Sequence, residues 1–192
     1  MPQPISALPH LTLLPPTPDI QPAIETLLDA AFGVDRFSKR SYGFRKGRPC
    51  VESLSRVAWN GNQLVGTLQY WDVDIENSVG ARQPALLLGP LGVSPDQQGT
   101  GVGRALIADT LIHAAHLGHQ IVLLVGPMHY YGRFGFQPAQ PLKITMPGEA
   151  PERLLVRALV PDVLEGVAGK VLPGRCSQPR NTLPNGDIVT EQ

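Results

Sequence analysis

The chain has 192 residues, of which 42% are hydrophobic and 17% are charged, and its formal net charge at pH 7 is zero. A chain of this size supplies one hydrophobic core, and its neutral charge balance excludes the strongly basic field that draws proteins to nucleic acid. It has no run of about 18 apolar residues and no signal-peptide pattern at its start, which predicts a cytoplasmic protein without a membrane segment. The two cysteines, Cys50 and Cys176, predict neither a disulfide framework nor a metal site.

Proline is concentrated at the two ends of the chain, and its 20 residues are about twice the average share. We therefore expect an irregular or extended arm at residues 1–18, a single domain at 19–172 and an irregular tail at 173–192.

The first predicted helix spans residues 19–33, where apolar residues recur at helical spacing, Asp19 is placed to cap the start and Gly33 follows the end. A basic run follows, with six Lys or Arg and no acid between residues 36 and 48, and with aromatic residues at 37, 42 and 44. Such a run indicates either a solvated face or a loop that contacts a charged ligand.

Residues 51–59 and 63–76 predict two strands that form a hairpin around an Asn-Gly-Asn turn. In the second strand, alternation places Tyr70, Asp72, Asp74 and Glu76 on one face and Trp71, Val73 and Ile75 on the other. The run PALLLGPLGV at 84–93 predicts a strand buried on both faces. Gly89 and Pro90 interrupt it, so we expect this strand to kink and to part from a neighbour near its middle.

The second predicted helix spans residues 101–117, with a polar stripe of Asp109, His113, His116 and Gln120 along an otherwise apolar surface. The apolar strand at 121–125 follows it, and this succession predicts a parallel pair with the strand at 84–93. Residues 141–146 and 153–159 predict closing strands, whereas the pattern of residues 161–171 is ambiguous.

Three glycines, Gly99, Gly101 and Gly103, lie at the start of this second helix. The N–H groups at a helix start lack intrahelical partners and carry partial positive charge, and glycine lets a phosphate approach them closely. The turn is therefore a candidate pyrophosphate cradle, with Arg104 adding a charge-assisted contact. A turn that only caps the helix is the alternative.

Two other phosphate-binding motifs do not fit these letters. A P-loop needs Lys and then Ser or Thr after its last glycine, where this chain has Arg104 and Ala105. A dinucleotide-binding turn needs G-x-G-x-x-G, and here the third glycine comes one residue early.

The segment Q-G-T-G-V-G at residues 98–103 resembles the Q/R-x-x-G-x-G/A signature of the GNAT superfamily of acyl-CoA N-acyltransferases. The strand LLLGPLGVSP resembles the bulged fourth strand of that family, and Y-G-R-F-G-F at 131–136 resembles its Y-x-x-x-G-F element. Residues 85–138 are similar in particular to a subgroup of bacterial predicted N-acetyltransferases. The resemblance implies an α/β (α+β) fold: a mixed, mostly antiparallel twisted sheet, a bulged central strand splayed from its parallel neighbour, and helices on both faces.

The resemblance also implies a function: an acetyl group passes from acetyl-CoA to a primary amine, of a small molecule or a protein, by direct attack in a ternary complex. The pyrophosphate would lie on the turn and the pantetheine arm along the bulged strand. The implied cofactor-binding residues are Leu91, Gly92, Val93, Gln98, Gly99, Thr100, Gly101, Val102, Gly103, Arg104 and Tyr131. Acetyl-CoA is then a co-substrate, and no metal is expected.

Tyr131 matches the tyrosine of the family that acts as general acid, and the adjacent Tyr130 is its rival. The base is less clear, because residues 85–93 contain no acid. The candidates are Asp72, Asp74 and Glu76, which share one face of their strand, and His129. A solvated acidic face is the alternative for the three acids.

The missing acid keeps a second function open, a non-catalytic acyl-CoA binding module. A third is a nucleic-acid adaptor that works through the basic run, although no nucleic-acid or membrane partner is expected. With its interleaved aromatic residues, the run is interpreted as a loop beside the acceptor channel. A homodimer is compatible with the sequence, and the acceptor cannot be read from it.

Overall fold

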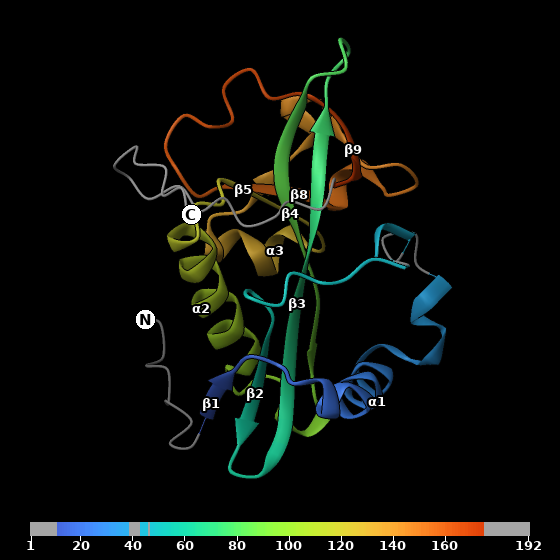
Figure 1. The fold of residues 1–192 in the computed structure, drawn as a ribbon, viewed down its shortest axis with the longest axis vertical. Coiled ribbons are helices and arrows are strands. Elements are labelled where there is room, and N and C mark those ends of the chain that lie inside the picture. The colour runs from blue at the N-terminus through green and yellow to red at the C-terminus, as the bar shows by residue number, and fades with distance from the viewer. Residues whose placement is uncertain (1–10, 39–42, 46, 175–192) are drawn as a thin grey trace, which may run out of the picture.

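The computed structural model describes residues 11–38, 43–45 and 47–174. Nine strands of this part of the chain form one sheet, and its helices lie against both faces (Figure 1). The strands are β1 (Leu11–Leu14), β2 (Arg56–Asn60), β3 (Gln63–Glu76), β4 (Arg82–Val93), β5 (Ile121–Val125), β6 (Gln137–Pro138), β7 (Ile144–Thr145), β8 (Leu154–Ala158) and β9 (Gly169–Pro173). The α-helices are α1 (Gln21–Phe32), α2 (Val102–His116) and α3 (Met128–Tyr131).

The sheet is mixed and mostly antiparallel, as the sequence predicts. Its main order is β1-β2-β3-β4-β5-β8-β6, and β4 and β5 form a parallel pair within it. The long strand β3 has different partners along its free side: β2 pairs with its first half and β9 with residues 73–76. The short strand β7 joins through β9. The fold class is therefore confirmed, including the predicted hairpin at Asn60–Gln63 and the parallel strand at 121–125.

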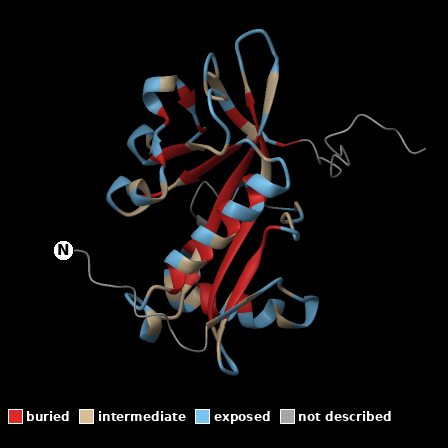
Figure 2. Ribbon diagram, turned by 90° about the vertical axis from the view of Figure 1, so that its left-hand side faces the viewer, coloured by how far each residue is buried: buried red, intermediate tan, exposed pale blue. Residues whose placement is uncertain are grey.

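The helices α1 and α2 cover opposite faces of the sheet. A Cβ added at Gly92 of β4 would collide with Leu27 and Leu28 of α1, and one added at Gly66 of β3 would collide with Val102 and Leu106 of α2. The strands beneath α2 are buried and the outer surface of the helix is exposed (Figure 2). The two glycines therefore let both helices lie directly on the central strands.

Some element boundaries differ from those predicted. The helix α1 begins at Gln21, and Asp19 lies in a 3-10 turn (Pro18–Ile20) instead of capping it, whereas Gly33 follows the helix end with a φ of 83° as expected. Strand β2 begins at Arg56 because hydrogen bonds from Leu54 and Ser55 to the carbonyl of Val51 close a turn there.

The region after α3 also differs. The predicted strand at 141–146 shrinks to β7, since residues 140–142 form a 3-10 turn, whereas β8 matches the strand predicted at 153–159. The ambiguous segment 161–171 contains the start of β9. At the other end, residues 11–14 of the proline-rich arm pair with β2 as an edge strand.

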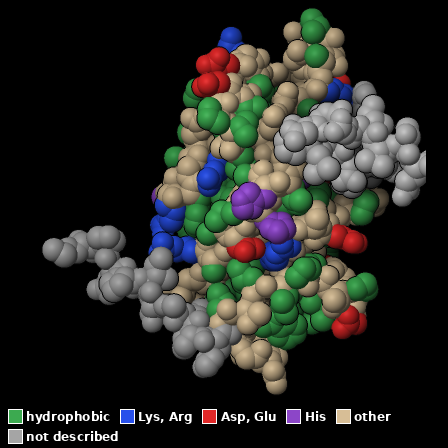
Figure 3. Space-filling model, turned by 60° about the vertical axis from the view of Figure 1, so that its left-hand side comes forward, with side chains coloured by type: hydrophobic (Ala, Val, Ile, Leu, Met, Phe, Trp, Pro, Cys, Tyr) green, Lys and Arg blue, Asp and Glu red, His purple; other side chains and the backbone are tan. Residues whose placement is uncertain are grey.

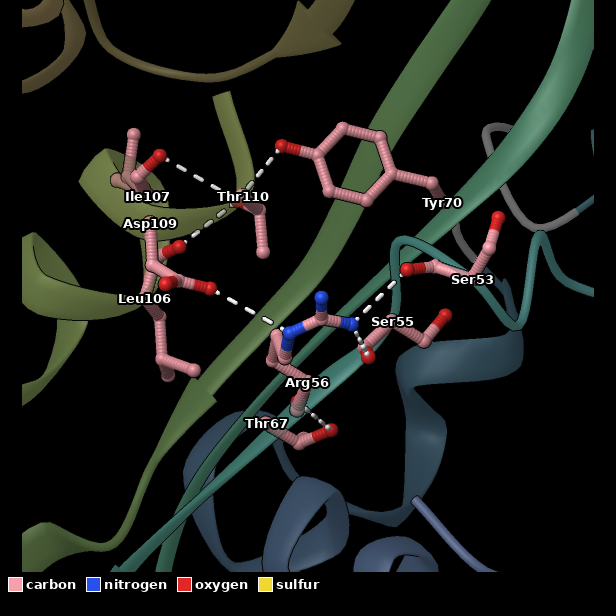
Figure 4. A network of polar contacts seen from close by, with 9 residues as sticks. All are labelled: Ser53, Ser55, Arg56, Thr67, Tyr70, Leu106, Ile107, Asp109 and Thr110. Carbon is pink, nitrogen blue, oxygen red and sulfur yellow. Dashed lines mark hydrogen bonds and ion pairs between the residues drawn. The ribbon is translucent and has the colours of Figure 1, made fainter. Parts of the chain in front are cut away.

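Buried polar contacts attach α2 to the sheet (Figure 4). The Thr110 hydroxyl donates to the carbonyl of Leu106 at 2.7 Å, so the Tyr70 phenol, 2.9 Å from Thr110 Oγ1, is the donor to that oxygen. Arg56 Nε lies 3.4 Å from Asp109 Oδ2, and its Nη1 donates to backbone carbonyls of the preceding turn. These contacts fix α2 on β2 and β3 and thereby fix the position of its N-terminus.

No helix among the described residues has the length and apolar character needed to span a bilayer.

Candidate active site

Strand β4 parts from β5 at the interruption predicted from the sequence. The parallel pairing covers only Leu86 and Leu87, and Gly89, with a φ of 122°, follows two residues later. On the other side, β4 stays paired with β3 up to Val93, with one extra β4 residue at the bulge. Beyond Leu87, the edge of β4 that faces away from β3 therefore has no strand partner among the described residues.

The glycine turn lies at the N-terminus of α2 and has the geometry of an anion cradle. Gly99 and Gly101 have φ values of 83° and 103°, and a Cβ at either position would meet no atom within 4 Å. The N–H groups of Gly99 and residues 101–103 donate to no described residue. The N–H groups of Gln98 and Thr100 instead donate to carbonyl oxygens of the preceding turn, those of Pro95 at 3.5 Å and Gln97 at 3.4 Å. The turn therefore presents amides without protein partners beside open space, which is the arrangement found where helix N-termini bind anions.

Gly103 has a different role from the one predicted. Its φ is not positive, and it lies in the first turn of α2, where a Cβ would stand 2.8 Å from the Tyr130 hydroxyl. The same Cβ would lie 3.7 Å from the Leu91 side chain and 3.6 Å from the Val93 side chain of β4. The missing side chain therefore makes room for Tyr130, while the backbone N–H of Gly103 stays among the amides without a described partner.

The two adjacent tyrosines of α3 lie at the open end of the split. Their rings meet edge to face with centroids 4.9 Å apart, and the Tyr131 ring covers Gly126, directly after β5. Burial raises the pKa of Tyr131 to about 12, with Tyr130 adding to the rise and Arg153 opposing it. Burial also raises the pKa of Tyr130, against the positive charges of Arg133 and Arg104. Both phenols are therefore protonated at neutral pH.

The exposed Arg104 side chain starts in the first turn of α2, beside the cradle. Its charge acts on Tyr130, which places the cradle and the tyrosine pair within electrostatic reach of each other. The cradle, the split and the two phenols thus form one continuous site at the C-terminal ends of β4 and β5.

The acidic candidates lie away from this site. Asp72 pairs with Leu86, three residues before Gly89, or about 10 Å along the strand. Asp74 and Glu76 lie farther along β3, where both form ion pairs with Arg82.

Burial raises the pKa of Asp72, and His119 and Arg48 oppose the rise. The fourth candidate base, His129, is exposed on α3. The structure therefore brings none of the three acids to the split. Among the described residues, no group of His, Cys, Asp or Glu is arranged to hold a metal ion.

The basic run is not a solvated face where the structure describes it. Arg36 is 2% exposed and bonds to Glu25 and to Asp29 of α1, the latter at 2.7 Å. Arg48 donates to the carbonyl of Gly174. The remaining parts of the predicted loop, residues 39–42 and 46, lie outside the described residues.

Two further residues lie near the split: Gln69, which the sequence does not single out, and Arg45, which belongs to the basic run interpreted as a loop beside the acceptor channel. Gln69 of β3 lies opposite the bulge, and the guanidinium of Arg45 stands over Gly89. A buried glutamine has no motif, and Arg45 was one cation among six, so only the fold reveals their position.

Other parts of the surface are weaker candidates for a functional site. On the face that carries α2, acidic, basic and histidine side chains are interspersed with apolar ones (Figure 3). That face gives no support to a nucleic-acid adaptor, which needs a basic stripe. One hollow lies at the outer edge of β1 and β2, and another between the tip of the β3–β4 hairpin and residues 165–168. Neither touches the split, where chemically useful groups converge.

A bulged strand that separates from its parallel neighbour beside a glycine-rich helix start is the arrangement that the resemblance of the sequence implies. The chain matches the family model of the acetyltransferase (GNAT) domain over residues 17–139, which is well over half of its length. This protein belongs to the GNAT acetyltransferase family.

The chain is similar to two uncharacterized N-acetyltransferases of Escherichia coli K12. It is 28% identical to YhbS over 152 residues, which is 78% of this chain and 88% of YhbS. It is 32% identical to YjhQ over 110 residues, which is 52% of this chain and 60% of the length of YjhQ.

Two solved structures are also similar. A crystal structure of YhbS from E. coli in complex with CoA has a TM-score of 0.73 at 26% identity and covers 84% of this chain and 88% of that chain. A GNAT family acetyltransferase from Brucella melitensis in complex with acetyl-CoA has a TM-score of 0.64 at 25% identity, over 84% of this chain and 94% of that one.

Proposed function

We propose that this protein transfers the acetyl group of acetyl-CoA to a primary amine by direct attack within a ternary complex. The observation that supports this most is the adjacency of the amides of Gly99 and residues 101–103 to the open edge of β4. The CoA and acetyl-CoA complexes of the related structures add to it.

The binding of acetyl-CoA uses backbone groups on two elements. The pyrophosphate lies on the cradle, where Arg104 adds a charge, and the amides of the pantetheine arm pair with the unpartnered edge of β4 at Leu91 and Val93. A ligand with amide groups can add to an exposed sheet edge as a further strand does. The glycines matter because a side chain at Gly101 would project into the phosphate position.

The transfer step forms one N–C bond and breaks one C–S bond. The amine nitrogen attacks the thioester carbon and loses one proton, and the CoA sulfur leaves as a thiolate and gains one proton. We assign the proton donor to Tyr131, whose phenol is buried and protonated, with Tyr130 as the alternative donor. None of the acids in the described part of the chain lies at the split to accept the proton of the amine, so we assign that proton to solvent.

The test is thiol release from acetyl-CoA in the presence of a panel of primary amines, with mass spectrometry of the products. We expect thiol release to depend on the amine and to match the acetylated product in amount. Stabilisation of the fold by CoA without thiol release from any amine would instead show a binding module, and would overturn the proposed activity.

A further inference from the structure

The α1 face of the sheet carries polar groups directly at the bulge of β4. The pairing passes from Leu68–Leu91 to Tyr70–Leu88, so Gln69 lies opposite Gly89 and Pro90. Strand alternation places Gln69 on the opposite face from Tyr70, which packs under α2. Gln69 therefore faces the α1 side, where an acceptor can reach the split without crossing α2.

The Gln69 side chain is largely buried. The residue is 6% exposed, its carboxamide makes no hydrogen bond to any residue that the structure describes, and its polar atoms are not among the fully buried ones that lack a partner. Solvent or a ligand can therefore reach the carboxamide. The position of this amide at the bulge favours a ligand.

Arg45 brings a permanent positive charge to the same place. Its Nη2 would lie 3.3 Å from a Cβ at Gly89, and its guanidinium carbon lies 5.1 Å from the centroid of the Trp71 ring. Trp71 is two residues after Gln69 on the same face, and its indole N–H donates to the carbonyl of Arg48 at 3.3 Å. The indole is therefore held in place and positions the guanidinium over the bulge.

The two acids of α1 form ion pairs with Arg36. Glu25 and Asp29 both bind Arg36, so that pair of carboxylates does not neutralise the bulge. A planar guanidinium matches a carboxylate in two parallel hydrogen bonds, which makes arginine the usual residue for recognising one.

We propose that Gln69 and Arg45 form the acceptor subsite, and that the acceptor is a small primary amine carrying a carboxylate, as an amino acid does. Arg45 binds the carboxylate, and the Gln69 carbonyl oxygen accepts a hydrogen bond from the amine. The inference rests on the proposed function, because the acetyl group has to lie at the bulge. It narrows the acceptor to one chemical class.

The experiment compares each amino acid of a panel with its own carboxamide, which keeps the amine and removes the negative charge. Acetyl transfer is measured for the wild type, for Arg45→Gln, for Gln69→Leu and for Lys170→Gln, a control that removes an exposed cation on β9. We expect the wild type to prefer the acids. In Arg45→Gln, we expect kcat/KM to fall at least about tenfold for the acids and to stay nearly unchanged for the carboxamides.

Two further readouts separate a binding role from a structural one. CoA should stabilise all four proteins equally, and Arg45→Lys should restore part of the preference for the acids. The Gln69→Leu variant should lose activity on both members of a pair, because both carry the amine. Equal activity on acids and carboxamides, or an equal loss on both in Arg45→Gln, would overturn the subsite and leave the acetyltransferase standing. If no member of this panel is acetylated but another primary amine is, the subsite is wrong and the acetyltransferase stands; if no primary amine at all causes thiol release, both proposals are overturned.

Discussion

Replacing Gly101 with valine should weaken CoA binding at least about tenfold and leave the fold intact. Gly101 has a φ of 103°, and a Cβ there would meet nothing within 4 Å, so the cost to the protein is backbone strain without a collision. Strain of this kind costs about 1–3 kcal/mol. A domain of typical stability, about 5–15 kcal/mol, survives that loss.

The substitution removes a larger fraction of the free energy of CoA binding than of the free energy of unfolding. A hydrogen bond between an amide and a charged phosphate contributes about 1.5–3 kcal/mol, so the loss of one weakens binding about tenfold to 150-fold. At a CoA concentration about 100 times the wild-type Kd, the wild type gains about 2.7 kcal/mol, and a variant with 100-fold weaker binding gains about 0.4 kcal/mol. For a chain of this size, the shift in Tm falls from roughly 5–11 °C to about 1 °C.

The matched control is Gly118→Val. Gly118 follows the other end of α2 with a φ of 80°, and a Cβ there also meets nothing within 4 Å, so its strain is the same and only its position differs. Thermal shift against CoA concentration measures both variants. The reasoning fails if Gly101→Val keeps its CoA shift, or if Gly118→Val loses as much.

Three further predictions concern the tyrosines and the sheet. Tyr131→Phe should lower kcat by about 100-fold or more with CoA affinity retained, and if only Tyr130→Phe has this effect in steady-state kinetics, the donor is Tyr130. Asp72→Asn should raise the free energy of unfolding at pH 7, because burial raises the pKa of this acid in the folded state, and the gain should vanish in urea titrations below its unfolded pKa of about 3.9. Unchanged stability at pH 7 would contradict that. Gly174→Ala should cost about 1–3 kcal/mol, because its Cβ would lie 2.6 Å from the Asp72 backbone, whereas Gly43→Ala, with open space around it, should cost little.

The elements defined by local patterns could be predicted from the sequence. The interruption at Gly89 and Pro90 indicated the parting of β4 from β5, and the Asn-Gly-Asn letters indicated the hairpin, because backbone restrictions act within a few residues. The start of α1 was misplaced because Asp19 competes with a proline-led 3-10 turn at the same point. Strand β7 was overestimated because its length depends on β9, which is distant in sequence.

The candidate site likewise contains parts that a local sequence pattern predicts and parts that only long-range contacts determine. The cradle follows from consecutive letters, and two of its three glycines adopt the expected backbone. Gly103 does not, since what fills the space beside it is Tyr130, 27 positions along the chain. Gln69 and Arg45 each lie beside the bulge only because β3, β4 and the segment before β2 come together in space. Contacts of this kind leave no trace in a local pattern.

In the proposed complex, acetyl-CoA lies along the free half of β4 and completes the sheet there. Beyond Leu87 this edge of β4 has no strand partner in the described part of the chain, and the Val93 carbonyl accepts only a 3.4 Å hydrogen bond from the Gln98 side chain, so the apoprotein should exchange its amide hydrogens rapidly along this edge. Once the cofactor lies there, the region should become as protected as the interior. Binding of the co-substrate would then complete the β-sheet. Because a ligand of the native state stabilises it, the lifetime of the protein in the cell should rise with the concentration of acetyl-CoA.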